Sequence, residues 1–263
     1  MLSLEPEIQK YFWRRFRKKA AIFSNFQDFL IPNDSLVELV LYSDGRDRIQ
    51  DLHLLPSNLK YRYWVLSRYS KNVLLKKSGL KPAHIHVIPR YELFPIKKPM
   101  TRLTNKNKPL KLIYSGRTDC LGKNFHLACA LASEIQAQWK ARVEFHVCGP
   151  NLMPNLVASE LLKYKWKTEP KLWNDLGRKW INKFKTGTLI NLSTFLGEDF
   201  GVSVAQAQQK GFSLIISDWG GHKDVIGANV IKISVRAINK ANSERKIREQ
   251  GKILSKEFLK AIK

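Results

Sequence analysis

The chain has 263 residues, 44% of them hydrophobic, and its 46 Lys and Arg against 22 Asp and Glu give a formal net charge of +24. A chain of this length can bury one large core or two modest ones. No apolar run reaches the ~18 residues of a spanning helix, and the N-terminus lacks a signal-peptide pattern. These features argue against a membrane-spanning or secreted protein and lead us to expect a cytoplasmic location.

The charge and the cysteines indicate which partners the protein could bind and which redox state its thiols have. The positive charge is spread along the chain, which is typical of a surface attracted to anionic membrane or to nucleic acid. A generally basic surface without a dedicated partner would give the same composition. The cysteines Cys120, Cys129 and Cys148 lack metal-ligand spacing, so we expect reduced thiols, with a packing role for Cys129 and Cys148.

The most basic stretch of the N-terminal third, residues 6–23, is expected to form a helix. Ile8, Phe12, Phe16 and Ala20 fall one turn apart on one face, with Lys and Arg side chains largely elsewhere. A basic amphipathic helix of this kind indicates binding to an anionic membrane surface. An ordinary domain helix whose aromatic side chains pack inward fits the pattern equally well.

The rest of this third is expected to alternate strands and helices. Apolar runs predict strands at residues 37–42, 63–66 and 84–88. His84 and His86 alternate along the last of these, as two metal ligands would, but no clear third ligand accompanies them. Residues 94–110 contain three prolines and no periodicity, which indicates a linker. We therefore expect a small N-terminal α/β domain, residues 1–105, and a larger domain, residues 106–263.

The larger domain is expected to begin with a phosphate-binding turn. A predicted strand, residues 110–115, leads into a Gly-Arg turn and then to Lys123 at the start of a helix, and the next strand is predicted at 143–148. Backbone N–H groups at a helix N-terminus, together with the cations of Arg117 and Lys123, would cradle a phosphate group. A solvated loop is the alternative interpretation of the same spacing.

The second half of this domain is also expected to alternate strands and helices. Strands are predicted at residues 188–192, 212–216 and 230–233, and helices at 201–209 and 242–263. Strands that alternate with helices predict a doubly wound parallel sheet, in which ligands bind beyond the carboxyl ends of the strands. Glu198 stands at such an end, just before a helix N-terminus, where an anion or a sugar could bind. Gly211 is expected to end its helix in the left-handed conformation.

The residues around Glu198 resemble a known family. Four short runs stand out: Glu198-Asp199-Phe200-Gly201, Gln206-Ala207, Gly211 and Asp218-Trp219-Gly220-Gly221. Together they are similar to the C-terminal half-site of the group 1 (family 4) retaining glycosyltransferases. The resemblance implies a GT-B fold, an α/β architecture with a Rossmann-like C-terminal domain that binds a nucleotide-sugar. It is weak over residues 1–59, which implies a shortened or atypical acceptor-side domain.

The resemblance also implies which residues hold the donor sugar. Glu198 matches the acid that holds the sugar and serves catalysis, with Phe200 beside it. Gln206 stands where the family has a second glutamate, at the position that contacts the ribose hydroxyls. An amide there can still accept and donate hydrogen bonds, but it lacks the charge that strengthens those of a carboxylate.

The same resemblance implies which residues bind the diphosphate and which partners the protein has. Arg117 and Lys123 match the family's diphosphate-binding cations, with Gly201 at the neighbouring helix N-terminus. No Asp-x-Asp triplet occurs, in keeping with the family's metal independence, so we expect neither a metal nor another cofactor. The implied reaction is the transfer of a hexose-type sugar, with retention, to a glycan, envelope or lipid-linked acceptor. The expected place is the inner face of an anionic membrane.

Two other functions fit parts of the sequence. A catalytically degenerate, donor-binding subunit is favoured by Gln206 and by the short N-terminal domain. A nucleic-acid-binding protein is favoured by the charge and by the Trp, Tyr and Lys residues interleaved at 61–71 and 164–180. That second function has no fold motif behind it and leaves the residues around Glu198 unexplained.

Overall fold

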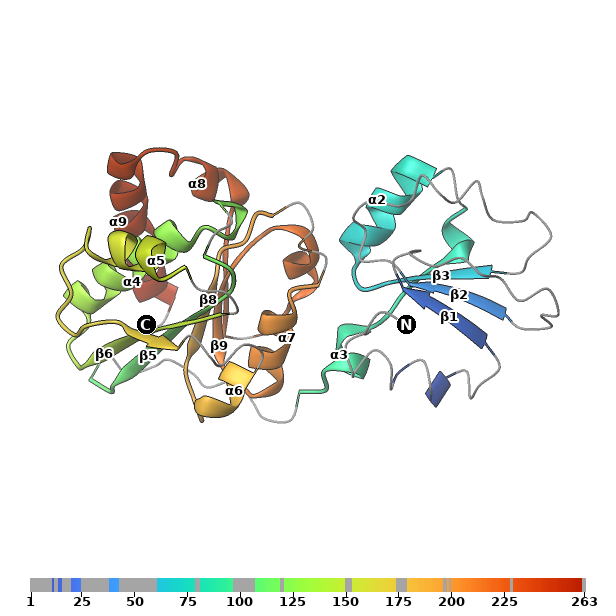
Figure 1. Ribbon diagram of the computed structural model, residues 1–263, viewed down its shortest axis with the longest axis horizontal. Coiled ribbons are helices and arrows are strands. Elements are labelled where there is room, and N and C mark those ends of the chain that lie inside the picture. Colours follow the sequence, from blue (N-terminus) through green and yellow to red (C-terminus); the bar gives the residue numbers. More distant parts are fainter. Residues whose placement is uncertain are drawn as a thin grey trace. The chain divides into compact units, whose positions relative to one another are not determined.

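Figure 1 shows the computed structural model as a ribbon. The structure describes residues 11, 14–15, 20–24, 38–42, 61–78, 81–96, 107–118, 121–149, 153–173, 179–195, 198, 200–227 and 229–261. The chain divides into two compact units, Met1–Pro95 and Ile96–Lys263. This division lies N-terminal to the boundary expected near residue 105.

The first unit contains a parallel sheet of four strands in the order β1-β2-β3-β4. The strands are β1 (Ala20–Ser24), β2 (Glu38–Tyr42), β3 (Tyr61–Val65) and β4 (Ile85–Val87). The helical elements described here are α2 (Arg68–Ser78), the 3-10 turn η2 (Pro82–His84) and α3 (Arg90–Leu93). Strands β2, β3 and β4 lie where apolar runs predict strands.

The expected helix at residues 6–23 is wrong at its C-terminal end. Residues 11, 14 and 15 are helical, but Ala20–Ser24 is strand β1 and pairs in parallel with β2. The sequence Ala-Ala-Ile-Phe-Ser has weak local preference, and pairing with a neighbouring strand decides its conformation. The remaining residues of the expected helix lie outside those that the structure describes.

The second unit is built on a parallel sheet of six strands in the order β10-β9-β8-β5-β6-β7. The strands are β5 (Leu110–Ser115), β6 (Val143–Cys148), β7 (Lys171–Trp173), β8 (Thr188–Asn191), β9 (Ser213–Ser217) and β10 (Val230–Ile233). The chain runs outward from β5 to β7, returns to the middle and runs outward again from β8 to β10. The doubly wound α/β fold is thereby confirmed, and its topological switch point lies between β5 and β8, where such sheets bind ligands.

Helices cover both faces of this sheet (Figure 1). They are α4 (Phe125–Gln138), α5 (Pro154–Leu161), α6 (Trp180–Lys183), α7 (Val202–Gln209), α8 (Val235–Asn239) and α9 (Glu244–Ala261), with 3-10 turns η3 (Leu121–Lys123) and η5 (Gly220–Asp224). Alternate residues of one strand serve opposite faces, since Leu112 and Tyr114 join the cluster under α4, α5 and α9, whereas Ile113 joins the cluster under α6 and α7. Burial on both faces explains why the strands are nearly continuous apolar runs.

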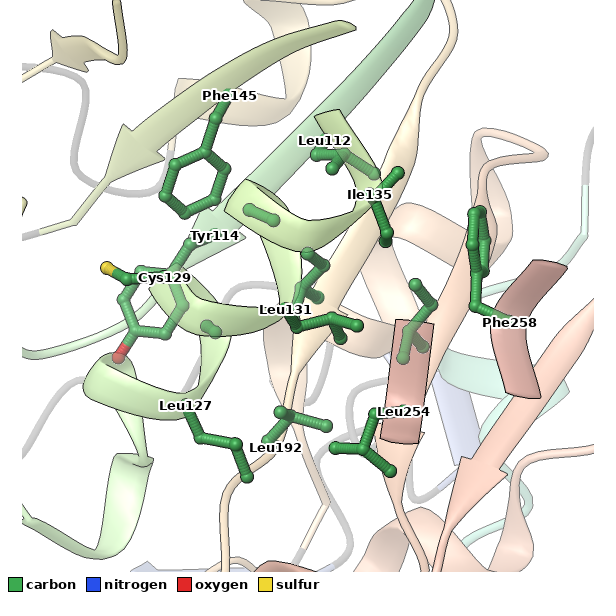
Figure 2. Close-up of a cluster of buried hydrophobic side chains, with 14 of the residues drawn as sticks. Leu112, Tyr114, Leu127, Cys129, Leu131, Ile135, Phe145, Leu192, Leu254 and Phe258 are labelled. Atoms are coloured by element: carbon green, nitrogen blue, oxygen red, sulfur yellow. The ribbon is translucent and has the colours of Figure 1, made fainter. Parts of the chain in front are cut away.

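The larger core lies between the sheet, α4 and α9 (Figure 2). Apolar residues at helical spacing on the first of these helices are all buried: Phe125, Ala128, Leu131, Ala132 and Ile135. Cys129 and Cys148 are buried free thiols, as expected, and burial raises the pKa of Cys148 to about 12. A thiol with so high a pKa remains protonated and packs as a small apolar group.

Helix α9 buries most of its sparse apolar stripe. Leu254, Phe258 and Leu259 are buried and Ile247 packs against the same core, whereas Ile253 is 50% exposed. Residues four apart share a helix face, and Leu254 rather than Ile253 lies one turn before Phe258. No helix in the described part of the chain combines the length and hydropathy needed to cross a membrane.

Candidate active site

Three loops leave the carboxyl ends of β5, β8 and β9 next to the switch point, and the first two are hydrogen-bonded to each other. The Thr194 N–H donates to the Gly122 carbonyl at 2.7 Å. The buried Asn124 side chain donates to the Leu192 carbonyl at 2.9 Å and to Thr194 Oγ1 at 3.0 Å. A Cβ at Gly122 would lie 3.1 Å from the Phe195 Cα, so the close approach of the loops favours glycine there.

The loop after β9 holds the main chain at the candidate acid and three residues before it. The Trp219 Nε1–H donates to the Phe195 carbonyl at 2.8 Å, and the Gly221 N–H donates to the Glu198 carbonyl at 2.9 Å. Gly220 has φ +52°, and a Cβ at this position would overlap the Glu198 carbonyl oxygen. The Trp-Gly-Gly run therefore has a structural reason, which is to let the two loops touch.

Glu198 and Lys123, both expected in the site, form an ion pair. Their side chains are 9% and 20% exposed, so the pair is largely removed from water. Burial alone would raise the pKa of Glu198, but the charge of Lys123 and hydrogen bonds from Lys123 and Ser193 lower that pKa. Glu198 is therefore a carboxylate at neutral pH. The Lys123 Nζ also lies 5.3 Å from the centroid of the Phe195 ring.

His222, which was not among the expected site residues, is fully buried between Ser217 and Gly201. Its Nδ1 is 2.9 Å from Ser217 Oγ, and the Ser217 hydroxyl donates to the Ser193 carbonyl. A Cβ at Gly201 would lie 2.6 Å from His222 Nε2. This imidazole is thus linked through Ser217 to the start of the loop after β8, and it lies against Gly201 at the start of α7.

The other expected site residues lie on the same loops and on α7. Arg117 is exposed in the loop after β5, and Gly201, with φ +67°, immediately precedes α7. Phe200 is buried and Gln206 is half-buried on α7. Asp199 lies outside the described residues. Of the expected site residues, Lys123 and Glu198 therefore contact each other directly, and Gly201 lies against His222.

The alternative metal site loses its geometric basis. Strand β4 begins at Ile85, so His84 lies in η2 and does not alternate with His86 along one strand. The His86 ring stacks on the Trp64 ring with centroids 5.0 Å apart. Among the residues that the structure describes, no group of three His, Cys, Asp or Glu side chains is arranged to hold a metal ion.

The fold has relatives among solved structures, although no protein-family model and no curated protein matches the chain. WaaG, a glycosyltransferase involved in lipopolysaccharide biosynthesis, aligns over 95% of this chain and 76% of its own with a TM-score of 0.55 and 10% identity. The chain has the GT-B glycosyltransferase fold. Anabaena HepE in complex with UDP-glucose aligns over 86% of this chain and 70% of its own, with a TM-score of 0.52 and 14% identity.

TarM gives the highest of these TM-scores, 0.58, over 96% of this chain at 13% identity. This chain spans only 54% of TarM. A TarM variant from S. aureus was solved with UDP and alpha-GlcNAc-glycerol, among other ligands. At these identities the likeness shows the shared fold, and the substrates belong to those proteins.

Proposed function

We propose that this protein is a glycosyltransferase that moves a hexose-type sugar, with retention, from a nucleotide-diphosphate sugar to an acceptor. The observation that carries the proposal is the buried Lys123–Glu198 ion pair at the switch point of the doubly wound sheet. A buried carboxylate and a cation at this edge match the two chemical groups of the donor, its sugar hydroxyls and its diphosphate. Solved structures of the same fold contain UDP-glucose or UDP, which supports this choice of ligand.

Each residue has a defined task in this proposal. Lys123 and the exposed Arg117 bind the diphosphate, and the N-terminus of α7, which begins after Gly201, adds backbone N–H groups. Negative charge accumulates on the diphosphate as the glycosidic bond breaks, and positioned cations stabilise it. Glu198 accepts hydrogen bonds from the sugar hydroxyls. Gln206 on α7 contacts the ribose.

The acceptor proposed is a glycan or lipid-linked molecule at the inner face of an anionic membrane. WaaG acts in lipopolysaccharide biosynthesis, and the net charge of +24 suits an anionic surface. Arg14 and Arg15 are both exposed, but the Arg15 guanidinium also lies 5.0 Å from the Trp64 ring centroid. Arg14 is therefore better placed than Arg15 to meet a membrane surface.

A second candidate is a donor-binding subunit without catalysis. Gln206 favours it, because the family places a second acid at this position. Such a subunit would bind a nucleotide-sugar and leave it intact, so binding and turnover must be measured separately.

Release of nucleotide diphosphate from UDP-, GDP-, ADP- and dTDP-sugars, with and without a membrane-lipid extract as acceptor, tests the proposal. We expect turnover of one donor and a large loss of that turnover in the Glu198→Gln variant. The control variant Glu257→Gln, which changes an exposed acid on α9, is expected to keep the wild-type turnover. Binding without turnover would favour the degenerate subunit. A folded protein that neither binds nor turns over any donor would contradict both.

A further inference from the structure

The protonation pattern of His222 follows from its hydrogen bonds. Ser217 Oγ donates its only proton to the Ser193 carbonyl, and a carbonyl oxygen can only accept. Towards His222, which lies 2.9 Å away, Ser217 Oγ must therefore act as the acceptor. The proton of this second hydrogen bond belongs to His222 Nδ1, which fixes the neutral ring as the Nδ1–H tautomer.

The other edge of the ring fills a space that a glycine leaves. Gly201 has φ +67°, and a Cβ built on it would lie 2.6 Å from His222 Nε2 and 2.7 Å from Cδ2. Real Cβ atoms do not approach other atoms so closely. The backbone that leads into α7 therefore packs directly against the imidazole. The position of this helix N-terminus depends on the ring.

The same ring belongs to the surroundings of Glu198. The Ser193 carbonyl lies at the start of the loop that carries Glu198, and Gly221, which precedes His222 in the chain, donates its N–H to the Glu198 carbonyl at 2.9 Å. The ring is thus linked through Ser217 to the start of the segment that carries the acid, and it lies against the Gly201 backbone that begins α7.

We propose that His222 is a positioning residue of the donor site, which holds the Glu198 loop and the N-terminus of α7 in register through its Nδ1–H and its ring volume. This inference rests on the proposed function, because it assigns the sugar to Glu198 and the diphosphate to the start of α7. His222 itself touches neither part of the donor. Its loss separates two groups that must bind one molecule together.

The tautomer is tested on the ligand-free protein by long-range ¹H–¹⁵N correlation spectra of the histidine rings. The His222 signals are identified by their absence in the His222→Asn variant. We expect a proton on Nδ1 and none on Nε2 at neutral pH, and the Ser217→Ala variant is expected to change this pattern. A neutral ring with its proton on Nε2 would overturn the proposed hydrogen-bond chain, whatever the protein binds.

The positioning role is tested by calorimetric titration of nucleotide-sugars below the unfolding temperature of each variant. The His222→Phe variant keeps a ring but cannot donate, and Ser217→Ala removes the acceptor; each is expected to weaken nucleotide-sugar binding about tenfold. The His222→Asn variant keeps an N–H donor and is expected to recover part of that loss. A merely structural role would lower the unfolding temperature of these variants and leave their affinity unchanged.

The outcomes separate this inference from the proposed function. If the wild-type protein binds no nucleotide-sugar, the proposed function fails, while the tautomer remains a valid measurement. If the wild-type protein binds one and the His222→Phe and Ser217→Ala variants bind it equally well, the positioning role is overturned and the proposed function stands.

Discussion

Replacing Lys123 by Met is expected to destabilise the second unit by about 2 kcal/mol at neutral pH. Removing one partner of a fully buried ion pair costs ~3–5 kcal/mol, because the remaining charge is left unpaired in a poorly solvated place. The Lys123 side chain is 20% exposed, so water compensates part of this loss. Adding Glu198→Gln to Lys123→Met removes the unpaired charge, and the double variant is expected to be more stable than Lys123→Met alone.

The same variant is expected to show a characteristic pH dependence. In the wild-type protein the folded-state pKa of Glu198 lies below its ordinary value, so ionised Glu198 stabilises the fold above about pH 4.3, the unfolded pKa. That contribution is lost as the pH falls through the folded pKa. Without Lys123, burial raises the pKa of Glu198, the carboxyl is protonated more easily, and the deficit of the variant shrinks as the pH falls from 7 towards 4.

Urea unfolding followed by tryptophan fluorescence at pH 7 and pH 5 measures both effects. Lys163→Met is the matched control, because Lys163 pairs with Glu160 at 2.8 Å but is 40% exposed. Pairs of that kind contribute ~0–1 kcal/mol, at either pH. If Lys123→Met loses no more stability than Lys163→Met, or loses the same amount at both pH values, the pair does not stabilise the site as argued.

Three further outcomes follow from the packing and the charge. Leu254→Ala is expected to lower the free energy of unfolding by ~2–5 kcal/mol, and Ile253→Ala by less than ~0.5 kcal/mol, since one side chain is 1% and the other 50% exposed; equal losses in urea unfolding would contradict the packing of α9. Gly201→Ala is expected to lower the melting temperature, because alanine is strained at φ +67° and its Cβ meets His222; an unchanged melting temperature would contradict that contact. The protein is expected to sediment with anionic and not with neutral liposomes, and Arg14→Glu is expected to weaken this about 30-fold, as the reversal changes two charges of ~1 kcal/mol each; equal recovery with both lipids would exclude electrostatic membrane binding.

Much of the second unit could be predicted because its strands are marked locally. β5, β6 and β10 begin and end where the sequence predicts them, at residues 110–115, 143–148 and 230–233. Each is a short, mostly apolar run, as both faces of the sheet are covered. β1 was missed because its residues follow a basic stretch with helical spacing, and only pairing with β2 makes them a strand.

The candidate site was predictable in its place and not in its contacts. Lys123 and Glu198 are 75 positions apart in the chain, and the resemblance to the glycosyltransferases, together with the rule that ligands bind beyond strand ends, selected both. Their ion pair was not expected, because each had been assigned to a different part of the donor. His222 gave no signal of its own, since a histidine after two glycines is typical of a loop. Its role depends on Ser217 and Gly201, which only the fold brings to it.

A thermal-shift panel with UDP-, GDP-, ADP-, dTDP- and CMP-sugars tests the central claim most directly, namely that this edge of the sheet binds a nucleotide-sugar. A donor at 100 times its dissociation constant adds ~2.7 kcal/mol of stability, which corresponds to a rise in melting temperature of about 5–10 °C for a chain of this size. We predict such a rise with one donor and a smaller one in the Lys123→Ala variant, which lacks the ammonium group proposed to bind the diphosphate. No rise with any donor at millimolar concentration, or an equal rise in both proteins, would contradict the claim.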